Sequence, residues 1–358
     1  MALNIGIVGL PNVGKSTLFN ALTDANALAA NYPFATIEPN TGVVPIPDDR
    51  LEELAKIYKT EKIVPATVTF VDIAGLVAGA SQGEGLGNQF LSHIRTTNAI
   101  CQVVRAFDDG DVQRAGSADP KHDIEIINTE LILADLQTVN NRLPRLEKEI
   151  KADAKLRPLL ELTQKLKDGL ENGKLAGSFL DKEELELIRD LQLLSAKPFV
   201  FVFNLSEDQL NNEGLKLQLK SIVNPAPAVF VSAKLESELR GLDQNDRNEL
   251  LASYGQTESG LVQLIHAAYS ALGLQSYLTA GEKEVRAWTI PAGATAPQAA
   301  GVIHTDFEKG FIAAQVVDYK DLVAAGSETA ARAAGKIRTE GKTYVMRPND
   351  VVEFRFNV

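Results

Sequence analysis

The stretch NIGIVGLPNVGKSTLFNAL, residues 4–22, decides which fold the chain is expected to adopt. A short apolar run at residues 5–8 leads into GLPNVGKST at residues 9–17, which matches the pattern GxxxxGK[ST] completely. Residues 18–22 then have helical character. A glycine-rich turn between a strand and a helix directs backbone N–H groups at phosphates, and the helix N-terminus adds positive potential. These residues therefore predict a nucleotide phosphate site in an α/β domain.

The residues of this turn have separate expected roles. The Lys15 ammonium should reach the β- and γ-phosphates, and the Ser16 hydroxyl should bind Mg²⁺. The whole expected phosphate cradle consists of Asn12, Val13, Gly14, Lys15, Ser16 and Thr17.

Two further elements are expected beside the phosphates. Asp72-Ile73-Ala74-Gly75 follows the apolar run at residues 67–71, so the Asp72 carboxylate would face the metal, and Gly75 would let the backbone approach the γ-phosphate. Thr36, within NYPFATIEPN at residues 31–40, supplies a hydroxyl that joins Mg²⁺ only when the γ-phosphate is present. These elements predict a switch domain with Ser16, Thr36 and Asp72 as metal ligands. Its catalytic residues would be Lys15, Thr36 and Gly75.

The stretch FVFVFNLSED, residues 199–208, is expected to read the base. Guanine-reading domains carry Asn-Lys-x-Asp after a buried strand, and the aspartate accepts two hydrogen bonds from guanine. Here Leu205 and Glu207 replace the lysine and the aspartate, and Glu207 is one methylene too long for that contact. Because adenine lacks both donors, losing the aspartate removes the main reason to reject adenine.

The other base contacts would come from polar and apolar groups nearby. Asn204 can meet N7 and the 6-amino group of adenine, and Leu205 offers an apolar face. Ser232, in Val231-Ser232-Ala233-Lys234, lies in a loop whose backbone should touch the base. A plain turn at the end of a strand is the alternative interpretation of residues 204–207.

Composition limits the class of protein. The formal net charge of −11 disfavours a protein that coats nucleic acid with its whole surface, although it allows a local basic face. The single cysteine, Cys101, fits a reducing cytosol and is expected to be a small buried side chain. No apolar run reaches the about 20 residues that cross a bilayer, and the N-terminus lacks a signal-peptide pattern. We therefore expect a cytoplasmic protein without membrane attachment.

Three domains are expected along the chain. Residues 1–127 and 196–275 alternate apolar runs with helical stretches, which predicts a doubly wound α/β sheet. Residues 128–195 predict an inserted helical arm, in which Pro144 should kink or interrupt the first helix. Residues 276–358 predict a small mixed α+β domain. The helical stripes of the arm are Ile132, Leu136, Val139, Leu143, Leu146 and Ile150, followed by Leu187, Leu191 and Leu194.

The motifs resemble a known family. The phosphate turn, NYPFATIEPN and DIAGLVAGASQGEGLGN at residues 72–88 are similar to the Obg superfamily of P-loop proteins. Residues 204–207, the helical insert and the C-terminal domain resemble the Obg-like ATPase (YchF) subfamily over essentially the whole chain. The resemblance implies a GTPase-like P-loop NTPase fold with a coiled-coil arm and a C-terminal β-grasp (TGS) domain.

The resemblance also implies an activity. It implies a cytoplasmic ATPase that prefers ATP to GTP, needs Mg²⁺ and associates with ribosomes. We further expect a monomer that contacts the rRNA of the large subunit, although the sequence itself does not determine the oligomeric state. It assigns metal ligation to Ser16 and Thr36, the phosphate cradle to residues 12–17, and base contact to Leu205. In related cation-dependent members the position of Asn12 helps to hold K⁺. A side chain that only stabilises the turn is the alternative role for Asn12.

The chain departs from related enzymes at three points. Leu76 stands where Ras-like enzymes carry a water-orienting glutamine, and DDGDVQR at residues 108–114 lacks the histidine common in the family. Ala106 follows Arg105 where the subfamily often has cysteine. Two alternatives to an ATPase therefore stay open, namely a nucleotide-sensing scaffold with negligible turnover and a GTPase with an altered specificity loop.

Two clusters of basic residues are candidates for rRNA contact, although solubilising side chains are the simpler interpretation. The arm cluster is Arg142, Arg145, Lys148, Lys151, Lys155 and Arg157. The C-terminal cluster is Arg332, Lys336, Arg338, Lys342 and Arg347.

Overall fold

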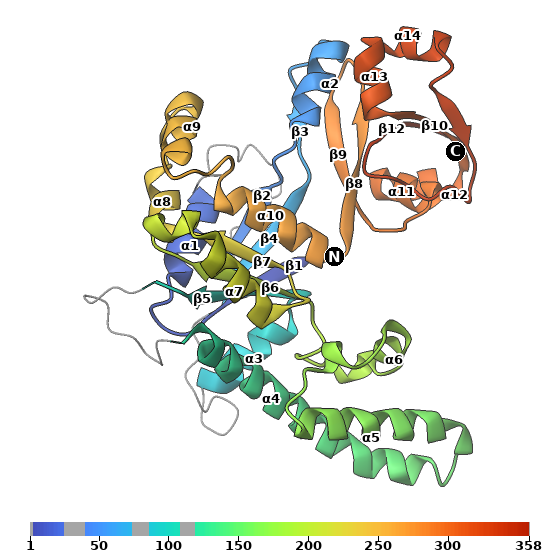
Figure 1. Ribbon diagram of the computed structural model, residues 1–358. Helices are drawn as coiled ribbons and strands as arrows, with labels where there is room; N and C mark the ends of the chain where they lie inside the picture. The colour runs from blue at the N-terminus through green and yellow to red at the C-terminus, as the bar shows by residue number, and fades with distance from the viewer. Residues whose placement is uncertain (1–2, 25–39, 74–85, 108–118, 358) are drawn as a thin grey trace. The chain divides into compact units, whose positions relative to one another are not determined.

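The computed structural model describes residues 3–24, 40–73, 86–107 and 119–357. The chain divides into two compact units (Figure 1). Unit 1 comprises Met1–Val43 and Thr69–Ala271, and unit 2 comprises Val44–Val68 and Leu272–Val358.

Unit 1 is built on a six-stranded sheet with the order β2-β4-β1-β5-β6-β7. The neighbouring strands from β4 to β7 pair in parallel. In a parallel sheet that helices cover on both faces, the side chains on both faces of a strand are buried. The strands of this sheet are therefore rich in apolar residues, and the sequence shows them as short apolar runs. The strands are β1 Asn4–Val8, β2 Thr41–Pro45, β4 Thr67–Asp72, β5 Ala99–Arg105, β6 Phe199–Asn204 and β7 Ala228–Val231.

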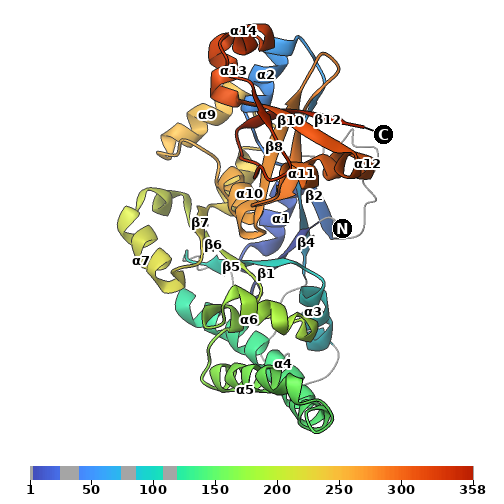
Figure 2. The same ribbon diagram turned by 90° about the vertical axis from the view of Figure 1, so that its right-hand side faces the viewer.

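Helices cover both faces of this sheet, as the doubly wound prediction required. Figure 2 shows α1 and α10 on one side of it, with α3 and α4 on the other. Cys101 on β5 is fully buried, and this burial raises the pKa of its thiol to about 12. The predicted structural role of Cys101 is thus confirmed. The helices are α1 Lys15–Asp24, α3 Leu86–Arg95, α7 Glu213–Val223, α8 Ala233–Glu238, α9 Gln244–Ser253 and α10 Gly260–Ala271.

The inserted arm is a pair of long helices, α4 Pro120–Glu149 and α5 Arg157–Glu171 (Figure 1). Val139 and Leu143 of α4 belong to the same buried cluster as Leu166 of α5, so the first predicted stripe is confirmed as a packing face. Pro144 was expected to kink or interrupt the helix, but α4 continues past it to Glu149.

The second helix of the arm was predicted in the wrong place. The long partner of α4 is α5, whereas Leu187 ends the short helix α6 Lys182–Leu187 and is 66% exposed. The stripe of Leu162, Leu166 and Leu170 was overlooked because it runs directly into the charged, glycine-containing stretch at residues 168–174.

A buried carboxylate fixes the chain that returns from the arm. Asp135 of α4 is completely buried, and it accepts hydrogen bonds from the backbone N–H groups of Leu194 and Ser195, each at 2.8 Å. The Ser195 hydroxyl donates a third bond of 2.6 Å. Burial raises the pKa of Asp135, and the three donors only partly offset this effect.

Unit 2 is a mixed α+β domain with the strand order β11-β10-β12-β8-β9-β3. The parallel neighbours β8 and β12 lie between the antiparallel pairs β8–β9 and β10–β12, as expected for a β-grasp arrangement. Its core contains Tyr277, whose ring meets Phe354 edge-on and whose hydroxyl donates to the Ala299 carbonyl at 2.9 Å. The strands are β3 Ile63–Val64, β8 Leu274–Ala280, β9 Val285–Pro291, β10 Phe311–Asp318, β11 Arg338–Glu340 and β12 Asp350–Phe356.

Residues 44–68 correct the expected domain boundaries. They were assigned to the nucleotide-binding domain, but the structure places them in unit 2, where β3 pairs in parallel with β9. The reason is a long-range strand pairing that no local pattern reveals. The helices of unit 2 are α2 Arg50–Tyr58, α11 Ala296–Ile303, α12 Thr305–Lys309, α13 Tyr319–Ala325 and α14 Glu328–Ala333.

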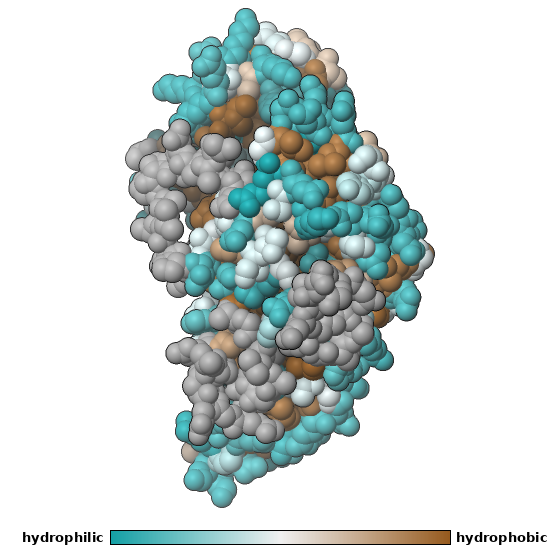
Figure 3. Space-filling model, turned by 90° about the vertical axis from the view of Figure 1, so that its left-hand side faces the viewer, coloured by the Kyte–Doolittle hydropathy of each residue, from teal (hydrophilic) through white to brown (hydrophobic). Residues whose placement is uncertain are grey.

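On the face drawn in Figure 3, the hydrophobic groups of the described residues that are visible lie among hydrophilic ones. Within the described parts of the chain, no helix combines the length and apolarity needed to span a bilayer.

Candidate nucleotide-binding site

The predicted phosphate turn leaves β1 at the point where the sheet order places β4 on one side and β5 on the other. This is a topological switch point, where open α/β sheets bind ligands. Asn12 and Gly14 have left-handed backbone angles, with φ of 64° and 93°. A Cβ atom at Gly14 would also collide with the Asn204 amide, so the turn requires glycine there for two reasons.

The turn passes directly into a helix. Leu18 N–H donates to the Gly14 carbonyl at 3.0 Å, and α1 begins at Lys15. Ser16 and Thr17 are exposed in the first turn of this helix, where the backbone N–H groups lack helical partners. An anion at this position would meet backbone donors and two hydroxyl groups together.

Lys15 and Asp72 form an ion pair between the phosphate turn and the end of β4. Both side chains are largely shielded from solvent. The backbone holds Asp72 in place, because its N–H donates to the Asn40 carbonyl and the next N–H, of Ile73, donates to the Ile7 carbonyl. The structure therefore brings together two residues that the sequence predicted for phosphate and metal binding.

Asn204 connects the phosphate turn to the predicted base loop. Its Nδ2 donates to the Val13 carbonyl at 3.0 Å, and its Oδ1 accepts from the Ala233 N–H at 3.0 Å. The side chain is buried, so Asn204 positions both loops. These two bonds use one N–H and one oxygen lone pair of the Asn204 side-chain amide. Its second N–H and second lone pair remain for the base contacts that the sequence predicts.

Glu207 does not stand free in the base loop. Its carboxylate lies 2.8 Å from Nζ of Lys234, and the side chain is only 16% exposed. Burial raises the pKa of Glu207, but the hydrogen bond and the positive charge of Lys234 outweigh it, so the pKa is lowered. The same hydrogen bond raises the pKa of Lys234. At neutral pH the two groups therefore form a charged pair.

Leu205 and Ser232 complete this end of the sheet. Leu205 is buried, and its N–H donates to the Val231 carbonyl at 2.8 Å. The Ser232 hydroxyl accepts from the Leu235 N–H at 3.3 Å and caps α8. The base contact predicted at Ser232 would therefore fall to its backbone. Lys234 was quoted in the sequence only as part of this loop, and its spacing from Glu207 gave no signal of their pairing.

Some predicted residues lie outside the described part of the chain. These are Thr36, Gly75, Leu76 and residues 108–114. Among the residues that the structure does describe, no three His, Cys, Asp or Glu side chains gather as a metal-binding group. Mg²⁺ sites at nucleotides need only one or two protein carboxylates beside phosphates and water, so the donor set of Asp72 and Ser16 fits this ion.

The fold and this site define a P-loop nucleoside triphosphatase with a GTPase-like α/β domain. Residues 4–149 match a family described as 50S ribosome-binding GTPase, and residues 274–357 match the family YchF-GTPase_C, described as a protein of unknown function. The chain is 51% identical to the "Ribosome-binding ATPase YchF" of Bacillus subtilis and 52% identical to that of Haemophilus influenzae, with each pair covered over its full length. The chain belongs to the YchF family.

Solved structures agree with this assignment. The Schizosaccharomyces pombe YchF GTPase superposes with a TM-score of 0.87 at 40% identity, covering 99% of this chain and 97% of that one. A GTP binding protein from Pyrococcus horikoshii has a TM-score of 0.63 at 22% identity, over 99% of this chain and all of that one, and so shares the fold. The fold predicted from the sequence is confirmed.

Proposed function

We propose that this protein is a cytoplasmic, monomeric ATPase that prefers ATP to GTP and switches conformation on the ribosome in a Mg²⁺-dependent way. The observation that carries the nucleotide preference is the ion pair between Glu207 and Lys234. The names of its relatives, which are ribosome-binding ATPases, support the activity and the partner.

The ion pair accounts for adenine acceptance in two ways. A guanine-reading carboxylate must be free to accept two hydrogen bonds from the base, and Lys234 already occupies the Glu207 carboxylate. A free carboxylate would also be left without donors when adenine binds, which costs about 1–3 kcal/mol for a buried polar group. Since Lys234 stays on Glu207, adenine suffers no such penalty.

The phosphate end supports hydrolysis. With nucleotide bound, the Lys15 ammonium would move from Asp72 to the β- and γ-phosphates, and Asp72 and Ser16 would hold Mg²⁺. The metal would supply positive charge against the developing negative charge on the phosphates. Thr36 and Gly75 would sense the γ-phosphate, and K⁺ beside Asn12 would add further positive charge.

The ribosome contact is proposed for the large subunit, because residues 4–149 match a family with that description. The arm supports an rRNA contact better than the C-terminal cluster does. In the C-terminal cluster Arg332, Lys336 and Arg338 form ion pairs with acidic side chains. Five arm side chains have no ion pair within the described residues, namely Arg145, Lys148, Lys151, Lys155 and Arg157.

Competition between ATP and GTP tests the proposal most directly. Calorimetry with a non-hydrolysable analogue of each nucleotide should give tighter binding for the adenine form, and purified protein should release phosphate from ATP over many turnovers when Mg²⁺ is present. Equal or tighter guanine binding would identify a GTPase with an altered loop. Binding without turnover would identify a nucleotide-sensing scaffold.

The double substitution Leu205→Lys and Glu207→Asp restores the guanine pattern and should shift preference toward GTP. In this double variant the shorter aspartate side chain at position 207 would also withdraw from Lys234. The single substitution Glu207→Gln tests the loss of the ion pair separately, because it removes the negative charge and keeps the length of the side chain.

A further inference from the structure

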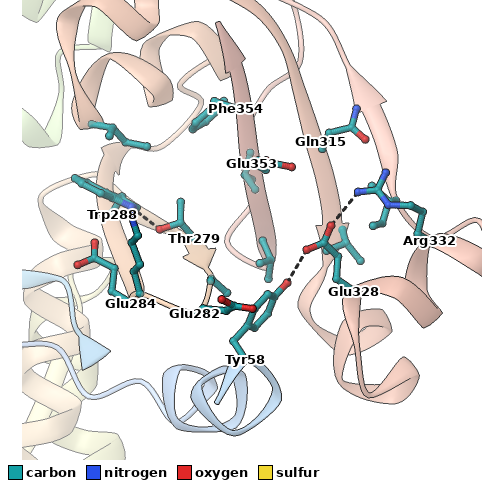
Figure 4. A pocket seen from close by; sticks show the side chains of 18 of the residues that line it. Tyr58, Thr279, Glu282, Glu284, Trp288, Gln315, Glu328, Arg332, Glu353 and Phe354 are labelled. Atoms are coloured by element: carbon teal, nitrogen blue, oxygen red, sulfur yellow. Dashed lines mark hydrogen bonds and ion pairs between the residues drawn. The ribbon is translucent and has the colours of Figure 1, made fainter. Parts of the chain in front are cut away.

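Unit 2 contains a cavity of about 730 Å³ that no part of the proposed ATPase cycle uses (Figure 4). Its lining comes from β8, β9 and the turn between them, from β10 and β12, and from α2, α11, α12 and α14. All of these elements belong to unit 2. A volume of this size is within the range of ligand pockets, about 300–1,000 Å³.

The cavity lies where two neighbouring strands separate. On one edge β12 pairs with β10 from Phe311↔Phe356 to Asp318↔Asp350. On its other edge the structure gives β12 a single register pair with β8, Val351↔Leu278. Beyond this pair, backbone groups of β12 on that edge have no strand partner among the described residues. They are an open strand edge inside the sheet, which is the kind of edge that binds an extended peptide.

The cavity reaches both faces of the sheet through this opening. Successive residues of a strand point to opposite faces, yet both Glu353 and Phe354 of β12 line the cavity. Figure 4 shows Trp288 and Phe354 on one part of the lining, with Glu353, Glu328 and Tyr58 on another. An inserted strand would thus meet an aromatic side and an acidic side with its alternate side chains.

The charge of the lining selects cationic side chains. Four carboxylates and two cations line the cavity. Glu284 pairs with Lys62 at 2.6 Å and Glu328 pairs with Arg332 at 2.9 Å, whereas Glu282 and Glu353 have no ion pair within the described residues. Trp288 already takes part in one cation–π contact, because the Arg286 guanidinium lies 4.0 Å from its ring centroid.

We infer that this cavity binds an extended basic peptide segment of a partner protein, which adds as a strand to the open edge of β12. Backbone hydrogen bonds to β12 would supply the register. Arginine or lysine side chains would meet Glu282 and Glu353, and apolar side chains would pack against Trp288 and Phe354. The inference does not depend on the nucleotide preference or on hydrolysis.

The full-length chain carries its own reporter, because Trp288 is its single tryptophan and lines the cavity. Three capped hexapeptides serve as probes: RVRVRV, the acidic EVEVEV, and RVRVRV methylated on every backbone nitrogen, which keeps the charge and the side chains but has no N–H group on its six residues to donate to a strand. RVRVRV should change Trp288 emission in a saturable manner, and the other two should bind at least about tenfold more weakly.

Substitutions then locate the binding. Glu282→Gln combined with Glu353→Gln alters only exposed side chains and should weaken RVRVRV binding by about fivefold. Glu52→Gln, an exposed carboxylate on α2 outside the lining, is the matched control and should leave binding unchanged. Equal binding of the methylated peptide would overturn strand addition. Absence of any Trp288 response to RVRVRV, or binding that the double substitution leaves unaltered, would overturn the site itself.

Discussion

The Glu207 carboxylate of the base loop lies 2.8 Å from the Lys234 ammonium in the first turn of α8. The two residues are far apart in the sequence, and Asn204 of the base loop also bonds to Ala233 at the start of α8 and to Val13 of the phosphate turn. The base end of the nucleotide site is therefore a network in which polar side chains are partly engaged by the protein itself. Selectivity should depend on that network as much as on the residues that touch the base.

Replacing Lys234 with methionine should reduce the preference for ATP over GTP by about three- to tenfold. The Glu207 carboxylate would lose its partner and become available to the donors of guanine, while adenine would leave it without a hydrogen bond. Calorimetry with both nucleotides measures the ratio. Lys216→Met removes a comparable ion pair, with Glu213 on α7, and should leave the ratio unchanged. The same ratio in both variants would show that Lys234 has no part in selectivity.

The pH dependence of this ion pair has a defined sign. Although burial raises the pKa of Glu207, Lys234 lowers it overall, so the folded protein holds the carboxylate more firmly ionised than the unfolded chain does. Its stabilising effect is fully present above the unfolded-state pKa of about 4.3, and it is lost as the pH falls through the folded-state value. Between pH 6 and 8 the ATP to GTP affinity ratio should therefore stay constant, and a drift in calorimetry over this range would point to another titrating group.

How far the sequence could predict the molecule depended on the range of the interactions. The strands of unit 1 are apolar on both faces, so their local composition was sufficient. The pairing of β3 with β9 joins residues 63–64 to residues 285–286, and no pattern within either segment indicates it. The Glu207–Lys234 pair was missed for the same reason. The helix α5 was missed for a local reason, since charged residues and Gly169 interrupt its leucine stripe.

Asn12 offers a test of the proposed K⁺ site. Its φ of 64° is a sufficient structural reason for asparagine, because this residue tolerates left-handed angles, so K⁺ binding needs independent evidence. Asn12→Gly preserves the backbone angle and removes the amide. If the amide helps to hold K⁺, the wild type should turn over faster in K⁺ than in Na⁺ at equal ionic strength, and the variant should lose this difference. A variant that keeps the full K⁺ effect would limit Asn12 to shaping the turn.

Asp135 should be a major stabilising residue of the arm junction. Asp135→Asn replaces one acceptor oxygen by a donor that faces the N–H groups of Leu194 and Ser195, so about 2–3 kcal/mol of unfolding free energy should be lost. Urea unfolding followed by circular dichroism measures this. Asp168→Asn, an exposed position on α5, should change the free energy by less than about 0.5 kcal/mol. Equal stability of the two variants would mean that residues 194–195 are held by apolar packing alone.

The arm should carry the electrostatic part of ribosome association. Lys148, Lys151 and Lys155 are exposed and have no ion pair among the described residues, so replacing all three with glutamine should strongly reduce co-sedimentation with ribosomes. Binding of the wild type should weaken steeply as salt is added, because neutralised phosphates release counterions, and the triple variant should show a shallower slope. Association should also be stronger with a non-hydrolysable ATP analogue than with ADP, since Thr36 and Gly75 are expected to sense the γ-phosphate.

A matched variant with Arg332, Lys336 and Arg338 changed to glutamine should pellet nearly as well as the wild type, because these side chains already form ion pairs. If the C-terminal variant loses binding while the arm variant keeps it, the arm is not the surface that meets rRNA.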